Sequence, residues 1–317
     1  MSQAAVHVGI DCGKSRLDAA LFPAVAHRQV ANTPEGHQEL AIWIKEQGAV
    51  RVGLEASGGY ERPVRDALVA VGLEVHVLDP ARVRYFAKAK GQWAKTDPID
   101  ARVIAEFTAC MAGGPSVVPD RAREELAGLV RTRRALVDKR ADLRKVATAA
   151  PEAAREAVDA AIEALSRSIA KLDDTLTRQV HSSPIIKQTV ERLVTAPGIG
   201  PVVAVSLAAL APELGRLTGG QMAALAGVAP FPDDSGERSG RRRIAGGRAD
   251  LRRVLYMAAM VAATHTKGIV AAFYQRLIKA GKPPKLAITA CMRKLLTRLN
   301  AMLAHAQTWN EQAGLKA

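Results

Sequence analysis

Residues 6–78 consist of short apolar runs separated by turn residues, a pattern typical of strands that alternate with helices. Strands are expected at 6–11, 16–22, 27–31, 50–55 and 73–78. Helices are expected at 35–47 and 60–71, with further helices up to Met111. Three adjacent strands followed by alternating strands and helices predict a mixed sheet covered by helices.

This element order is that of ribonuclease H-like domains, so an α/β domain of this class is predicted for residues 1–118. The composition changes next. Glycine and proline gather between Met111 and Val118, and a charged, alanine-rich helical segment follows as far as about His181. A second domain is therefore expected at 119–183, and a third at 184–317.

The central segment carries apolar residues at coiled-coil spacing. Steps of four and three separate Val158, Ile162, Leu165, Ile169, Leu172 and Leu176, and steps of seven separate Ala122, Leu129, Leu136 and Leu143. Two helices joined near Pro151 are expected. They form either an antiparallel coiled-coil hairpin that packs on its own domain or an intermolecular coiled coil that dimerises the protein.

The third segment is predicted to be mostly α-helical. Gly198-Ile199-Gly200 lies between two expected helices and is similar to the turn of a helix-hairpin-helix motif, whose backbone N–H groups meet a nucleic-acid phosphate. The alternative is a tight connection that needs glycine dihedrals. Helices near 249–265 and 285–305 are basic on one face, which either touches nucleic acid or is simply solvated. Their cations are Arg252, Arg253, Arg293, Lys294 and Arg298.

Charge narrows the class of partner. A formal net charge of +14 and a pI near 10.0 favour a polyanion, with nucleic acid as the default. No apolar run of about eighteen residues and no signal-peptide pattern is visible, so a cytoplasmic protein without membrane contact is expected. Cys12, Cys110 and Cys291 lack zinc spacing and are expected to be reduced packing residues.

Four carboxylates are placed as in a metal-dependent nuclease. Asp11 and Glu55 end two of the expected strands, while Asp97 and Asp100 open a helix and share one of its faces. Mg²⁺ is held by a few carboxylates together with substrate phosphates. The alternative for each is an ordinary cap or surface acid.

A long basic loop, residues 229–248, carries the second group of candidates. Ser235 is a potential nucleophile if a base, a metal or nearby charge activates it, with Ser239 as a rival. Arginines would stabilise charge on a phosphorus transition state. They are Arg238, Arg241, Arg242, Arg243 and Arg248. Asp234-Ser235-Gly236 is also common turn chemistry.

Six short motifs in this order resemble insertion-sequence transposases that join a RuvC-like DEDD domain to a C-terminal serine-bearing transposase domain. They are Ile10-Asp11, Gly53-Leu54-Glu55-Ala56, Lys95–Ala101, Ala196–Gly200, Asp234-Ser235-Gly236 and Gly246-Gly247-Arg248. The resemblance implies that Asp11, Glu55, Asp97 and Asp100 bind Mg²⁺ and that Ser235 becomes covalently joined to DNA. It also implies a homo-oligomer, donor and target DNA, and a noncoding bridge RNA that guides the protein.

The resulting hypothesis is a DNA transposase that works through a phosphoserine intermediate. One rival is a RuvC-like nuclease that cleaves with metal-activated water. The other is a nucleic-acid-binding protein without catalysis, in which the acids only stabilise the fold. Aromatic residues make up 4% of the chain, so base stacking is not expected to be the main mode of RNA recognition.

Overall fold

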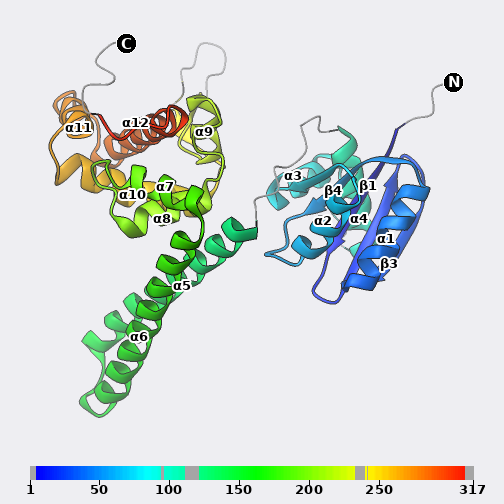
Figure 1. Ribbon diagram of the computed structural model, residues 1–317, viewed down its shortest axis with the longest axis horizontal. Coiled ribbons are helices and arrows are strands. Elements are labelled where there is room, and N and C mark those ends of the chain that lie inside the picture. Colours follow the sequence, from blue (N-terminus) through cyan, green and yellow to red (C-terminus); the bar gives the residue numbers. More distant parts are fainter. Residues whose placement is uncertain (1–4, 94–95, 111–120, 233–239, 241, 311–317) are drawn as a thin grey trace. The chain divides into compact units, whose positions relative to one another are not determined.

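The structure is a computed structural model that describes residues 5–93, 96–110, 121–232, 240 and 242–310 (Figure 1). The chain divides into two compact units, Met1–Val118 and Pro119–Ala317. Ser235, Ser239, Arg238 and Arg241 lie outside the described residues.

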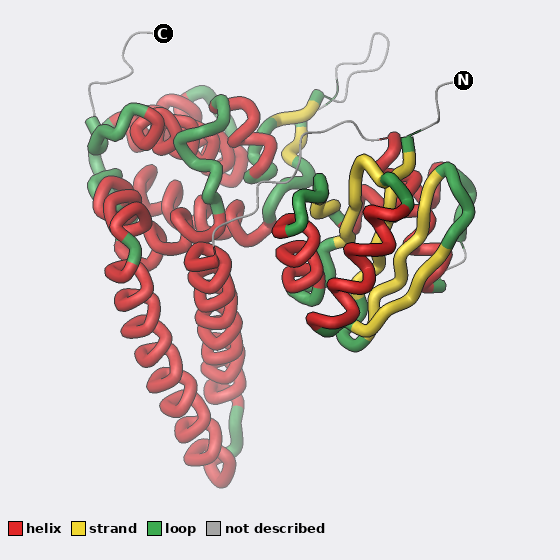
Figure 2. The backbone as a smooth tube through the Cα atoms, turned by 45° about the vertical axis from the view of Figure 1, so that its right-hand side comes forward, coloured by secondary structure: helices red, strands yellow, loops and turns green. Residues whose placement is uncertain are grey.

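The N-terminal unit is built on a five-stranded mixed sheet (Figures 1 and 2). The strands, in chain order, are β1 (Val6–Cys12), β2 (Arg16–Phe22), β3 (His27–Ala31), β4 (Ala49–Glu55) and β5 (Val75–Leu78). Their spatial order is β3-β2-β1-β4-β5, with β1, β2 and β3 antiparallel and β1, β4 and β5 parallel. The mixed sheet predicted from the element order is confirmed.

Helices cover both faces of this sheet. They are α1 (Pro34–Glu46), α2 (Glu61–Ala70), α3 (Pro80–Ala89) and α4 (Asp97–Cys110). Val8 and Ile10 of β1 are buried in one cluster with residues of α1 and α2. Successive side chains of a strand point to opposite faces, so Gly9 and Asp11 face the other side, where α4 packs on β1.

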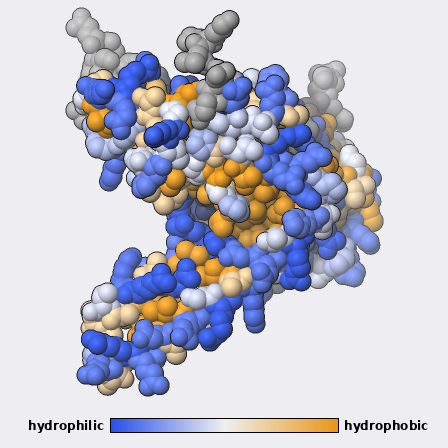
Figure 3. Space-filling model, turned by 60° about the vertical axis from the view of Figure 1, so that its left-hand side comes forward, coloured by the Kyte–Doolittle hydropathy of each residue, from blue (hydrophilic) through white to orange (hydrophobic). Residues whose placement is uncertain are grey.

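The C-terminal unit begins with two long helices, α5 (Arg121–Ala149) and α6 (Glu152–Ser182), which run side by side (Figure 2). Their base is buried against the next helices through Leu126, Val130, Leu176 and Val180. Towards the far end the apolar seam is only half-buried, and the lowest part of Figure 3 shows hydrophobic patches there among hydrophilic side chains. The two helices joined near Pro151 are confirmed, while an intermolecular coiled coil stays a prediction.

The rest of this unit is helical, as expected from its sequence. Its elements are α7 (Pro184–Leu193), α8 (Pro201–Leu210), α9 (Gly219–Leu225), β6 (Pro230–Phe231), β7 (Arg243–Ile244), α10 (Ala249–Thr264), α11 (Ile269–Lys279) and α12 (Pro284–Ala304). Alanine and leucine side chains of α8, α10 and α12 form a large part of its core. In the described part of the chain no single helix is long and apolar enough to span a membrane. The helices α10 and α11 reach the required length and apolar composition only together, and they are bent by 82° relative to each other.

Candidate active site

The four predicted acids come from three elements of the N-terminal unit. Asp11 lies near the end of β1, Glu55 ends β4, and Asp97 and Asp100 lie in the first turn of α4. Gly9 pairs with Gly53 across the parallel strands, and each acid follows its glycine by two residues. Asp11 and Glu55 therefore share the face of the sheet on which α4 packs.

The two glycines allow α4 to approach the sheet closely. A Cβ at Gly9 would overlap backbone atoms of Ala101 and Ala105, and one at Gly53 would overlap the Thr108 hydroxyl. Even an alanine would therefore push α4 away from the strands. This close packing fixes the start of α4, and with it Asp97 and Asp100, near the ends of β1 and β4.

All four acids line a single pocket of about 280 Å³. Its remaining lining comes from α3 and the turn after it, and from Val103 of α4. The expectation that these carboxylates converge rested on their positions in the sequence, and the structure brings all of them to one place. Their role as metal ligands stays a prediction.

The acids repel one another in this pocket. Burial is the largest effect that raises the pKa of Asp11 above its usual value, followed by the negative charges of Asp100, Asp97 and Asp18. A hydrogen bond from the Cys12 backbone opposes this rise. Such a site favours either a proton or a cation, because each relieves the repulsion.

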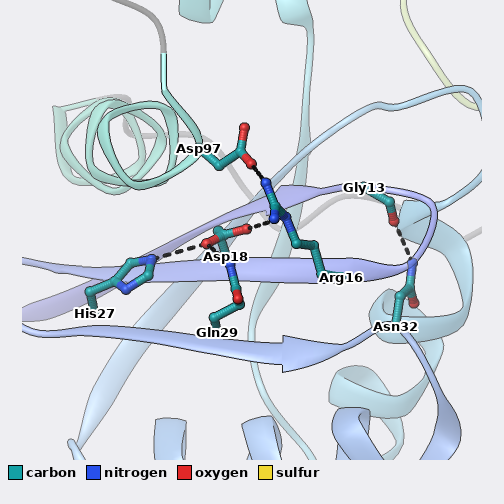
Figure 4. A network of polar contacts seen from close by, with 7 residues as sticks. All are labelled: Gly13, Arg16, Asp18, His27, Gln29, Asn32 and Asp97. Atoms are coloured by element: carbon teal, nitrogen blue, oxygen red, sulfur yellow. Dashed lines mark hydrogen bonds and ion pairs between the residues drawn. The ribbon is translucent and has the colours of Figure 1, made fainter.

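One of the four acids is already paired with a protein cation. The Arg16 guanidinium, from the start of β2, forms an ion pair with Asp97, and its Nε lies 3.6 Å from Asp18 (Figure 4). Asp18 is 2% exposed and also contacts the His27 ring nitrogen at 3.2 Å and the Gln29 amide at 2.8 Å. The sequence analysis missed Arg16 and Asp18. Asp18 is the register partner of Asp11 across β1 and β2. The alternation of side chains along β2 could therefore have indicated that Asp18 faces the same side of the sheet as Asp11.

The donor chemistry of the pocket suits a hard divalent cation, since carboxylate oxygens are its preferred protein ligands. Asp97 is paired with Arg16, and within the described residues no three acidic, histidine or cysteine side chains converge closely enough to hold a metal ion. Metal binding thus requires the carboxylates to approach further and Arg16 to release Asp97.

Two of the C-terminal candidates, Arg242 and Arg243, lie at the base of the basic loop. Phe231 of β6 pairs with Arg243 of β7, so a short ladder, which the sequence analysis did not predict, closes the loop that carries Ser235. Arg242 and Arg243 are exposed at this base.

The next arginines are held by contacts within the unit. Arg248 makes a two-pronged ion pair with Glu213, at 2.7 and 2.6 Å, and donates to the Leu210 carbonyl at 3.0 Å. Arg252 donates to the Gly246 carbonyl at 2.6 Å, and Arg253 lies 4.0 Å from Asp138. The contacts of Arg248 and Arg252 stabilise the unit. They do not test the prediction that these arginines bind nucleic acid.

The two glycines of the predicted hairpin motif differ. Gly198 has a φ of +76°, and a Cβ there would overlap the Ala258 carbonyl of α10, so this position requires glycine for packing. Gly200 is exposed at the N-terminus of α8, with open space around its Cα. Both glycines line one pocket, but only Gly200 has open space where a side chain would stand.

Two family models match successive parts of the chain, and the first match extends past the boundary of the N-terminal unit into α5. Residues 8–150 match the DEDD transposase model of the IS110 type, and residues 190–275 match the model of the transposase IS116/IS110/IS902 family. Pilin gene-inverting proteins of Moraxella bovis and Moraxella lacunata are 26% and 25% identical, and each alignment covers 96% of this chain and 98% of the relative.

Among solved structures, Thermus thermophilus RuvC aligns over 35% of this chain and 99% of its own, with 15% identity and a TM-score of 0.28. The family matches begin at the strand that carries Asp11 and include the stretch that follows the basic loop. Residues 8–150 and 190–275 are thus each similar to a transposase domain of the IS110 type.

Proposed function

We propose that this protein cleaves and rejoins DNA as a site-specific transposase, with its acids and Ser235 acting on the same strand break. The observation that carries the proposal is the meeting of Asp11, Glu55, Asp97 and Asp100 at one pocket. Acids of this kind are costly to gather unless they serve a cation. Donor and target DNA are the substrates, and the net charge of +14 fits these polyanions.

Mg²⁺, when bound, would polarise the scissile phosphate and stabilise charge on its oxygens. The four carboxylates would hold it. In the cleavage step the Ser235 Oγ forms a bond to phosphorus while a P–O bond to the sugar breaks. The serine hydroxyl loses a proton and the departing sugar oxygen gains one, so the reverse reaction reseals a strand without ATP.

The arginines at the base of the loop would surround the phosphate that carries the developing charge. Arg242 and Arg243 are exposed there, and Arg238 and Arg241 belong to the same segment. A homo-oligomer would supply the acids and the serine from different subunits. A bridge RNA paired with donor and target DNA would select the DNA sites, and the protein would bind the nucleic-acid backbones.

A denaturing gel tests the nucleophile. The protein is incubated with its copurified RNA, Mg²⁺ and labelled DNA, and a protein–DNA adduct that survives denaturant is expected. Ser235→Ala should abolish the adduct, whereas the matched variant Ser239→Ala in the same loop should retain it. An adduct that persists in Ser235→Ala refutes the assignment.

A metal-dependent nuclease is the second candidate, favoured by the fact that all four acids lie within one unit, which does not contain Ser235. Strand cleavage without any adduct, lost in Asp11→Asn, would establish that alternative. Recombination that is unchanged in Asp11→Asn would instead show that the acids only support the fold.

A further inference from the structure

The acid pocket has a second wall, formed by α3 and the turn after it. Asp79 caps this helix by accepting a hydrogen bond from the Ala81 N–H at 2.7 Å, directly after β5. Its residues on the pocket are Pro80, Val83, Arg84, Ala87 and Lys88, which share one helix face. This wall therefore brings two cations to the pocket that the acids line.

Arg84 and Lys88 are exposed and one turn apart, so their charges repel each other. Neither forms an ion pair or a side-chain hydrogen bond with another described residue. Two neighbouring cations are engaged: Arg82 of α3 lies over the Phe107 ring at 5.5 Å, and Lys90, just after α3, pairs with Glu106. The two cations at the pocket are thus the ones left for an external anion.

Trp93 completes the wall. A left-handed Gly91, with a φ of +73°, ends α3, and the Gln92 N–H bonds back to the Ala87 carbonyl at 2.9 Å. This turn places the Trp93 side chain on the pocket, where it is 78% exposed. Of the other two tryptophans, Trp43 is buried and Trp309 is covered by the Arg298 guanidinium.

An exposed indole beside two unpaired cations is the chemistry of a single-strand nucleic-acid groove, where cations follow the backbone and aromatic rings stack on bases. In a duplex both faces of each base are covered by neighbouring bases. Only an unpaired or extruded base can stack on a side chain in this way. An acidic wall alone would repel such a strand, and Arg84 and Lys88 offset that repulsion.

We propose that this wall binds an unpaired stretch of the nucleic-acid strand, with Trp93 stacked on a base and Arg84 and Lys88 on the adjoining phosphates. The inference deepens the proposed function and rests on it, because the bound phosphodiester is the one that the acids act on. Trp93 is a positioning residue here. The substrate at the pocket is then DNA that is locally single-stranded.

Tryptophan fluorescence tests this directly in the full-length protein. A single-stranded oligothymidylate is titrated with Ca²⁺ in place of Mg²⁺, and quenching is expected in the wild type and in Trp309→Phe. Trp93→Phe should lose most of the quenching. Trp93→Ala should weaken binding of this probe about 5- to 150-fold, the range of one lost base stack.

Tyr85→Ala is the matched control, since Tyr85 is 71% exposed on the same helix but does not line the pocket. It should change affinity by less than about twofold. Arg84→Ala and Lys88→Ala should each reduce the slope of log affinity against log salt by about 0.7. Quenching that remains in Trp93→Phe, or equal quenching by a blunt duplex, overturns the proposal.

Calorimetry with Mn²⁺ in the absence of DNA separates this proposal from the proposed function. Trp93→Ala should bind Mn²⁺ as the wild type does, and Asp11→Asn should bind it more weakly. Mn²⁺ binding without oligothymidylate quenching refutes the Trp93 inference alone. Quenching by the oligonucleotide without any Mn²⁺ binding supports Trp93 and refutes the metal function of the acids.

Discussion

The candidate site residues of the two units differ in charge and in the structural elements that carry them. In the N-terminal unit the candidate acids lie on strands and on the first turn of a helix, and glycines press these elements together. In the C-terminal unit the candidate cations lie in and after a loop, and Arg248 and Arg252 are held by internal contacts. Strands and helices fix the geometry of a site before any ligand binds, whereas the geometry of a site on a loop depends on the ligand.

The largest expected effect concerns the acids themselves. Asp11→Asn should lower the rate of Mg²⁺-dependent strand cleavage by about 10²-fold or more, the scale seen when one charge-stabilising group is lost. Asp66→Asn, which alters an exposed acid of the same unit, is the control. Equal cleavage by both variants would remove the acid pocket from the mechanism.

The same substitution has a pH-dependent effect on stability. The pKa of Asp11 is raised in the folded state, so the folded protein binds this proton more tightly than the unfolded chain. Stability is then lost as the pH rises from the ordinary aspartate pKa of 3.8 through the raised pKa. In the presence of a chelator, Asp11→Asn should have a higher Tm than the wild type at pH 7 and the same Tm at a pH below 3.8, which thermal scans at both pH values can check.

The close packing behind the acids is tested by Gly9→Ala. Since the new Cβ would overlap the backbone of α4, about 3 kcal/mol of unfolding free energy should be lost. Gly128→Ala in α5 meets no atom within 4 Å and should add about 0.5–1 kcal/mol. Urea denaturation measures both, and a neutral Gly9→Ala would mean that α4 is free to shift.

The engaged and exposed arginines of the C-terminal unit should behave differently. Arg248→Ala breaks the ion pair with Glu213 and should cost about 1 kcal/mol of stability. Arg242→Ala should change the free energy of unfolding by less than about 0.5 kcal/mol. It should reduce the slope of log DNA affinity against log salt concentration by about 1. The opposite pattern would assign the structural role to Arg242 instead.

The smallest effect is expected at Arg16, which competes with a metal for Asp97. Arg16→Ala should raise Mg²⁺ affinity several-fold in calorimetry, because Asp97 is then paired with no arginine. Arg28→Ala, which breaks the exposed ion pair between β3 and Glu39 of α1, should leave the affinity unchanged. Weaker Mg²⁺ binding in Arg16→Ala would show that Arg16 organises the site.

The strands and helices of the N-terminal unit follow the predicted ranges to within a few residues, because their apolar periodicity is a local property. The hairpin β6–β7 was missed because two-residue strands carry no periodicity. The network of Asp18 with Arg16, His27 and Gln29 was missed for a different reason: its members meet across strands, and each residue type is ordinary by itself.

The sequence by itself determined the element order, the basic character of the chain and the four acids, since each depends on residue type and spacing along one segment. Only the tertiary structure decided that these acids line one pocket, that Arg16 already pairs with Asp97, and that Trp93 and two cations line the same pocket. Those relations join residues far apart in the chain, and packing between elements, which no local pattern encodes, sets their distances.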